Sequence, residues 1–190
     1  MSNYLLAKKV VDIPVLAFIR PRAGGFNYSD LEFEVMKRDM KAYYDAGARS
    51  FVFGILTENN EIDVDRCRIL MDSCPDCEFI FHKAFDYVND FDRSIQDLIE
   101  LGFVRVLTSG GVKSVLDHLD TLKYLIETYG EQTGGGIIVE NVETVIESLP
   151  LKSILLSAKK WKEDTINYIA TSYEELSQVV KIVNMYNAKT

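Results

Sequence analysis

Short apolar runs alternate with amphipathic stretches along most of the chain, and this alternation limits the folds open to it. The runs are continuous and rich in β-branched and aromatic residues, as is typical of strands buried on both faces of a parallel sheet. A repeated order of strand then helix implies right-handed crossovers, and these also predict a parallel sheet. The expected strands are residues 15–19, 51–56, 79–81, 104–107 and 153–156.

The stretches between these runs carry apolar residues at helical spacing. Ser29 and Glu32 have the spacing of a capping box, in which each side chain bonds the other residue's backbone N–H. Ser172 and Glu175 repeat this pattern near the C-terminus, and Gly102 is suited to end a helix. The expected helices are residues 4–10, 30–46, 64–71, 91–101, 116–129, 142–149 and 173–183.

Polar or glycine-rich sequence follows nearly every expected strand. An open doubly wound sheet concentrates its site at one switch point, whereas a barrel carries functional groups after many strands. We therefore predict an α/β fold of the TIM-like parallel (β/α) barrel type. Because a complete barrel takes about 250 residues, the 190 residues of this chain predict an incomplete barrel of about six βα units. The chain is expected to form one domain, residues 1–190.

Composition limits the classes of binding partner and the cellular compartment that we expect for this chain. Apolar residues make up 47% of the chain, and 29 acidic against 21 basic residues give a net charge of −8. An acidic chain repels nucleic acid and anionic membranes, so neither is an expected partner. The N-terminus does not have the pattern of a signal peptide, and no apolar run reaches the roughly 18 residues of a membrane span. Three cysteines make no disulfide framework, which favours a cytoplasmic location.

An incomplete barrel has exposed strand edges, which are an aggregation hazard. We expect these edges to be covered by the N-terminal segment or by a second subunit. The second possibility predicts a homo-oligomer.

Arg20 and Arg22 flank a proline directly after the first expected strand. Guanidinium groups bind carboxylate and phosphate through two parallel hydrogen bonds, so this pair predicts an anion-binding site. The alternative is a structural ion pair with a neighbouring carboxylate at a strand end, such as Asp86.

His82, Lys83 and Asp86 follow the third expected strand. Side chains alternate along a strand, so His82 and Lys83 are expected on opposite faces. A histidine beside a carboxylate can act as a general acid or base, which makes His82 and Asp86 the candidate catalytic residues. Lys83 is a candidate anion ligand. The alternative is a structural histidine held by hydrogen bonds.

Two glycine-rich segments precede expected helices. Glycine lets backbone amides approach an anion, and a helix N-terminus favours negative charge, so both segments are candidate phosphate-binding loops. Turns also need glycine, which is the alternative explanation. The candidate residues are Thr108, Ser109, Gly110, Gly111, Gly134, Gly135 and Gly136.

Cys74 and Cys77 form a CxxC motif, with Cys67 upstream. Soft thiolates suit Cu(I) or zinc, but a structural zinc site needs four ligands and the chain has no second pair. A thioredoxin-type motif opens a helix after a strand, whereas this one is expected between a helix and a strand. The alternative is a loop with incidental thiols.

Several ordered motifs together resemble the CutC copper-homeostasis family. They are IRPR at 19–22, YSD at 28–30, VFGILT at 52–57, EID at 61–63, FHKAFD at 81–86 and LTSGG at 107–111. The resemblance implies a TIM-like barrel, a cytoplasmic location and a proposed role in copper homeostasis. The family pattern begins with a strand, a helix and a second strand that this chain lacks, so the first two strands would be missing. Lys83 replaces an arginine of that pattern, and Leu155 replaces a histidine.

Three functions follow as hypotheses, and whether the protein is an enzyme stays open. The first is copper homeostasis with Cu(I) bound by Cys74 and Cys77. The second is an enzyme or binding protein for a small anionic, phosphorylated metabolite, held at the strand ends. The third is a degenerate inactive paralogue or a truncated gene model.

Overall fold

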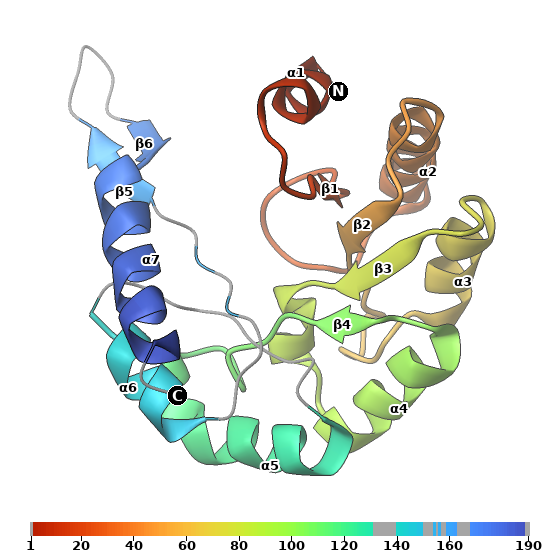
Figure 1. Cartoon of the computed structure of the whole chain (residues 1–190). Coiled ribbons are helices and arrows are strands. Elements are labelled where there is room, and N and C mark those ends of the chain that lie inside the picture. The colour runs from red at the N-terminus through yellow and green to blue at the C-terminus, as the bar shows by residue number, and fades with distance from the viewer. Residues whose placement is uncertain are drawn as a thin grey trace. The chain divides into compact units, whose positions relative to one another are not determined.

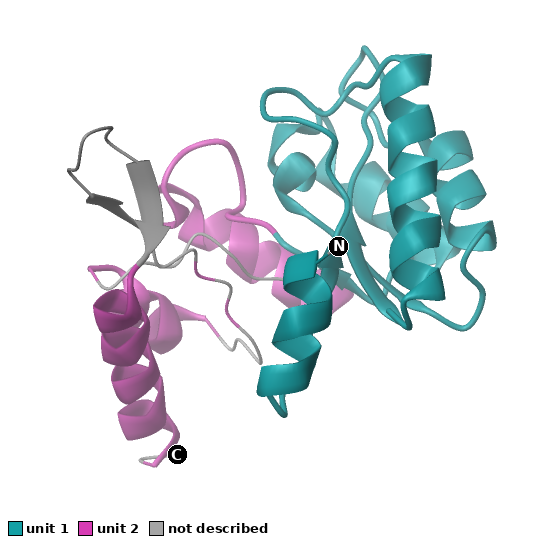
Figure 2. Ribbon diagram, turned by 90° about the horizontal axis from the view of Figure 1, so that it is seen from above, with its two compact units in different colours: residues 1–107 teal, residues 108–190 magenta. Residues whose placement is uncertain are grey.

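A four-stranded parallel sheet forms the centre of the N-terminal part of the chain. In the computed structural model the described residues are 2–130, 140–149, 154, 156, 159–162 and 168–188. Contacts within the chain divide it into two compact units, Met1–Leu107 and Thr108–Thr190 (Figure 2). The prediction of one domain stays a prediction.

The strands of unit 1 lie in the order β1-β2-β3-β4, and each neighbouring pair is parallel, as predicted. All three residues of the run Phe51–Phe53 are buried, and so are those of Phe79–Phe81. This burial on both faces explains why the sequence shows continuous apolar runs instead of alternation. The strands are β1 (Ala17–Phe18), β2 (Ser50–Phe53), β3 (Glu78–Phe81) and β4 (Arg105–Val106).

One helix follows each of the first three strands, and these helices lie on the same side of the sheet (Figure 1). Ser29 caps the first of them, and the predicted capping box with Glu32 is present in full. Asp63 and Asp90 cap the next two, and Gly102 ends the third with a left-handed backbone, φ 93°. The helices of unit 1 are α1 (Ser2–Val10), α2 (Asp30–Asp45), α3 (Val64–Asp72) and α4 (Phe91–Leu101), with a short 3-10 helix η1 (Lys83–Tyr87) after β3.

Aromatic side chains fill the core of unit 1. The Phe103 ring lies 5.1 Å from that of Phe53 and 5.4 Å from that of Phe81, and Phe79 contacts both Phe51 and Phe53. All five rings are buried, so the sheet is held by interlocked aromatic packing as well as by its hydrogen bonds.

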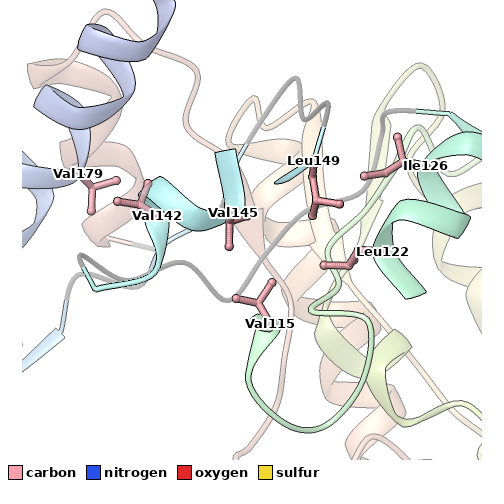
Figure 3. Close-up of a cluster of buried hydrophobic side chains, with 7 residues drawn as sticks. All are labelled: Val115, Leu122, Ile126, Val142, Val145, Leu149 and Val179. Atoms are coloured by element: carbon pink, nitrogen blue, oxygen red, sulfur yellow. The ribbon is translucent and has the colours of Figure 1, made fainter. Parts of the chain in front are cut away.

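Unit 2 is mostly helical in its described residues. Its apolar cluster joins the helices that follow β4 to the C-terminal helix, and comprises Val115, Leu122, Ile126, Val142, Val145, Leu149 and Val179 (Figure 3). The elements are the 3-10 helix η2 (Val115–His118), α5 (Leu119–Tyr129), α6 (Val142–Ser148), β5 (Lys159–Lys162), β6 (Tyr168–Thr171) and α7 (Tyr173–Asn187). The strands β5 and β6 are antiparallel, and the sequence did not predict this ribbon.

Four of the expected strands are present, each followed by a helix. Most of the fifth, residues 153–156, lies outside the described residues. The structure therefore tests the prediction of about six βα units only in part. Among the helices of the described ranges, none combines the length and the apolar character that a membrane crossing requires.

Candidate functional site

The carboxyl ends of three neighbouring strands place Arg20, Gly54 and His82 at one edge of the unit 1 sheet. The ladder continues past the strands, because Ile19 N donates to Val52 O at 2.9 Å and His82 N donates to Phe53 O at 3.0 Å. Residues that follow β1, β2 and β3 are therefore neighbours in space. This is the edge at which barrels and open α/β sheets carry their sites.

His82 is buried, with 3% of its surface exposed. Its Nδ1 accepts a hydrogen bond from Ala84 N at 3.2 Å, so Nδ1 holds the lone pair and Nε2 carries the proton of the neutral ring. Burial, reinforced by the positive charge of Arg20, lowers the pKa of His82 to about 4. At neutral pH the imidazole is therefore uncharged, and its buried Nε2–H has no hydrogen-bond partner among the described residues.

Gly54 allows the imidazole of His82 to lie directly against the backbone of the neighbouring strand end. A Cβ atom at this position would come within 2.5 Å of His82 Nδ1 and 3.0 Å of Phe81 Cζ. Real Cβ atoms do not approach so closely, so glycine is the residue that fits here.

The guanidinium of Arg20 lies over the ring of Phe26, 4.6 Å from its centroid. The Phe26 ring in turn lies 5.0 Å from that of His82. Arg20 donates to Gly24 O at 2.6 Å, while its Nε is buried without a partner in the described part of the chain. No carboxylate of the described residues lies within ion-pair distance of Arg20, whose charge is thus available to an anion.

Tyr28 adds a third buried polar atom to this neighbourhood. Burial raises the pKa of its phenol, and the positive charge of nearby Arg20 opposes that rise. Its hydroxyl is buried and lies beside the side chain of Arg20. Buried polar groups in folded proteins nearly always have partners, so His82 Nε2 and Arg20 Nε are the described atoms at this end of the sheet whose hydrogen bonds a ligand could complete.

Arg22 is engaged within the protein. It forms an ion pair with Glu32 at the start of α2, and it donates to the carbonyls of Gly25 at 2.9 Å and Asn27 at 2.8 Å. The hydrogen bond from Arg22 is the main cause that lowers the pKa of Glu32 to about 2. The alternative of a structural ion pair thus holds for Arg22, with Glu32 as the partner in place of the suggested Asp86.

A pocket of about 740 Å³ opens beside Arg22 and Tyr28. Its second arginine, Arg66, pairs with Asp30 and Asp63, so both guanidinium groups face carboxylates. Four carboxylates against two arginines make the pocket acidic, which does not suit an anionic ligand. The lining residues are Arg22, Asn27, Tyr28, Ser29, Asp30, Glu32, Thr57, Glu58, Asp63 and Arg66.

Residues 3–160 match the model of the CutC family. The chain belongs to the CutC family. The copper homeostasis protein cutC homolog of Homo sapiens is 40% identical over 172 residues, covering 88% of this chain but 63% of the relative. The family protein CutC of Treponema denticola is 35% identical over 168 residues and covers 86% of this chain and 68% of that relative. This CutC chain thus spans less than two thirds of the human relative.

Solved structures confirm the predicted fold class, an incomplete parallel α/β barrel. The CutC structure from Streptococcus agalactiae has 32% sequence identity and a TM-score of 0.71, covering 80% of this chain and 75% of that one. An aldolase, QR15, has a TM-score of 0.60 at 16% identity over 80% of this chain and 72% of its own, and this likeness concerns the fold alone.

Lys83 and Asp86 of this CutC chain pair with each other, Nζ to Oδ2 at 3.4 Å. The Lys83 side chain is 44% exposed while His82 beside it is buried, which fits the predicted opposite faces. Asp86 is buried in η1. The ion pair with Lys83 does not test whether Asp86 acts as a general base, so that role stays a prediction.

The first glycine-rich segment belongs to unit 2. Gly110 N donates to Thr108 Oγ1 at 2.9 Å, and Gly110 and Gly111 have φ values of 78° and 153°. Both glycines pack against His118, where a Cβ would lie under 3.0 Å from that side chain. The Nε2 atom of His118 is itself buried. Ser109 is buried as well. The second segment, Gly134, Gly135 and Gly136, lies outside the described residues.

The CxxC motif lies between α3 and β3, as the sequence predicted. Cys74 is buried and Cys77 half-buried, and burial raises the pKa of both thiols. Cys67, buried within α3, has its thiol pKa raised for the same reason. The described residues hold no group of three or more histidine, cysteine or acidic side chains arranged to bind a metal ion.

Sequence reasoning missed three contributors to the site, namely Gly54, Phe26 and Tyr28. Gly54 stands within an apolar run and within the VFGILT motif, so it was interpreted as part of a strand and of the family pattern, without a role at the site. Phe26 and Tyr28 lie in the loop between β1 and α2, where no periodicity marks a side chain as buried. A signal for Tyr28 existed, because an aromatic residue directly before an N-cap often packs back onto the helix.

Proposed function

We propose that Arg20 and His82 form a binding site for the anionic group of a small molecule. The observation that carries the proposal is the buried Nε2–H of His82, which lies close to Arg20. Neither this donor nor the charge of Arg20 has a partner among the described residues. A buried donor left without an acceptor costs about 1–3 kcal/mol. A ligand oxygen would remove that cost, and the charge of Arg20 would select an anion.

The two residues would contribute differently. Arg20 supplies charge and the geometry of a guanidinium, which matches carboxylate and phosphate oxygens. His82 supplies a directed hydrogen bond without charge, since its ring is neutral at pH 7 with the proton on Nε2. The Tyr28 hydroxyl is a further donor in the same neighbourhood. Lys83, Arg22 and the glycine-rich loops stay candidate ligands that this proposal does not require.

Replacing Arg20 with glutamine should weaken the binding of phosphate and sulfate at least about tenfold, because hydrogen bonds to charged groups contribute roughly 1.5–3 kcal/mol. Isothermal titration with each inorganic ion measures the effect. The matched control is Arg38→Gln, which removes an arginine that is 80% exposed on α2 and should retain wild-type affinity.

The pH dependence gives a second check on the same site. The pKa of His82, about 4, lies well below the range from pH 6 to 8, so sulfate affinity should be constant there.

Equal affinities of Arg20→Gln and the wild type would contradict the proposal. Failure of both ions to bind would also contradict it and would favour a degenerate paralogue.

A second candidate function is the binding of Cu(I) by Cys74 and Cys77. The human and mouse relatives are named copper homeostasis proteins, and soft thiolates favour Cu(I). The two thiols lie close enough for Cys74 to contribute to the raised pKa of Cys77. Because burial raises both pKa values, copper would have to displace protons, and its affinity should increase with pH.

The Cys77→Ser variant should bind Cu(I) at least about tenfold more weakly than the wild type, since it leaves one of the two soft ligands. A titration against a competing Cu(I) chelator measures the affinity. Cys67→Ala serves as the matched control, because Cys67 is buried within α3 and outside the motif. Equal affinities of Cys77→Ser and the wild type would exclude the CxxC motif as the copper site.

We further propose a cytoplasmic location and a homo-oligomer. Three free cysteines support the first. The second rests on β1, which has β2 as its neighbour in the described sheet and pairs with no further described strand on its other edge. A purely monomeric species in light scattering would exclude the oligomer.

A further inference from the structure

Aromatic rings lie beside the imidazole of His82, whose Nε2–H has no partner within the described ranges. The Phe18 ring lies 5.5 Å from the imidazole and the Phe26 ring 5.0 Å from it. The Tyr87 ring lies 5.3 Å from that of Phe26. These three residues come from β1, from the loop that follows it and from η1, so elements distant in sequence contribute rings to the same place.

Two of the three rings are open to solvent. Phe18 is 53% exposed and Tyr87 is 51% exposed, although the neighbouring His82 is almost completely buried. A single exposed apolar side chain requires no explanation. Here two exposed rings lie beside a buried donor and beside Arg20, which has no carboxylate partner in the described ranges. Apolar walls with a few polar groups are the composition of small-molecule sites.

We propose that the ligand of the Arg20–His82 site carries a planar aromatic body on its anionic head, as in an aryl or heteroaryl phosphate or carboxylate. This inference rests on the proposed anion site. The head would accept hydrogen bonds from Arg20 and His82 Nε2. The body would cover the exposed faces of Phe18 and Tyr87, where ring contacts and the removal of apolar surface from water both favour binding.

Matched pairs of probes separate the contribution of the body from that of the head. Inorganic phosphate is compared with phenyl phosphate, and acetate with benzoate, by calorimetric or NMR titration of the whole chain. In at least one pair the aromatic member should bind about tenfold tighter. The pair that shows this preference tells whether the head is a phosphate or a carboxylate.

Variants test whether the rings cause the preference. Phe18→Ala and Tyr87→Leu should each reduce the affinity ratio within that pair to about threefold or less. Both side chains are half exposed, so these variants are expected to fold. Tyr173→Ala, at an 82% exposed aromatic residue of α7, is the matched control and should keep the wild-type ratio.

The outcomes distinguish this inference from the function on which it rests. If the simple anions bind and the aromatic members bind no tighter, the aromatic body is wrong and the anion site stands. If no probe binds, both proposals fail. An aromatic preference that survives in both Phe18→Ala and Tyr87→Leu would also overturn the inference, because the body would then contact other residues.

Discussion

Replacing Phe53 with alanine is expected to lower the free energy of unfolding by about 3–5 kcal/mol. The side chain is completely buried in β2, and its ring lies against those of Phe79 and Phe103. Removing it leaves a cavity lined by aromatic rings that cannot collapse without moving two other elements. Because domains are typically stable by only 5–15 kcal/mol, this loss is a large share of the total. Urea denaturation followed by circular dichroism measures it.

Phe53→Leu is the matched control, since leucine keeps most of the apolar volume and should give a clearly smaller loss. The slope of the unfolding free energy against urea should stay the same in both variants, because the surface exposed on unfolding is unchanged. A loss below about 1 kcal/mol in Phe53→Ala would show that this ring does not belong to a tightly packed core.

The central strands could be predicted closely from the sequence, and the outer ones less so. Burial on both faces produced the continuous apolar runs of β2 and β3, and the observed strands begin within one residue of the expected ones. Residues 15–19 were expected as a strand, but β1 contains only Ala17–Phe18. It pairs with β2 alone in the described sheet, so fewer ladder hydrogen bonds hold its ends.

The sequence pointed to Arg20 and Arg22 alike, and the structure separates them. Both follow β1, so strand position could not tell which of the two stays free to bind a ligand. Glu32 decides this, because the capping box with Ser29 holds its side chain at the N-terminus of α2, where it meets Arg22. The signal was present in the sequence, since the Ser29–Glu32 spacing was recognised, but its consequence for an arginine ten residues away requires the path of the loop.

His82 could be placed at the site but its chemistry could not be predicted. Its neutral state depends on burial and on the charge of Arg20, and its tautomer depends on the amide of Ala84. The close packing of the ring depends on Gly54, in a different strand end. These are contacts between residues far apart in sequence, which periodicity does not encode.

Replacing Leu122 with alanine should lower the free energy of unfolding by about 2–5 kcal/mol. The side chain is 1% exposed and belongs to the apolar cluster of unit 2, with Val115 and Ile126 among its members. Leu31→Ala is the matched control, because Leu31 is 82% exposed on α2 and should change stability by no more than about 0.5 kcal/mol.

The same variant tests the prediction that residues 1–190 form one domain. In a single cooperative domain the slowest-exchanging amides open only through global unfolding, so a loss in α5 is shared by the whole chain. Hydrogen exchange of Leu122→Ala should then accelerate in peptides of β2 and β3 as much as in α5. If exchange accelerates in α5 while β2 and β3 keep their wild-type rates, units 1 and 2 unfold independently and the single-domain prediction is wrong. In that case the proposed anion site at Arg20 and His82 would belong to a unit whose stability does not depend on the packing of α5.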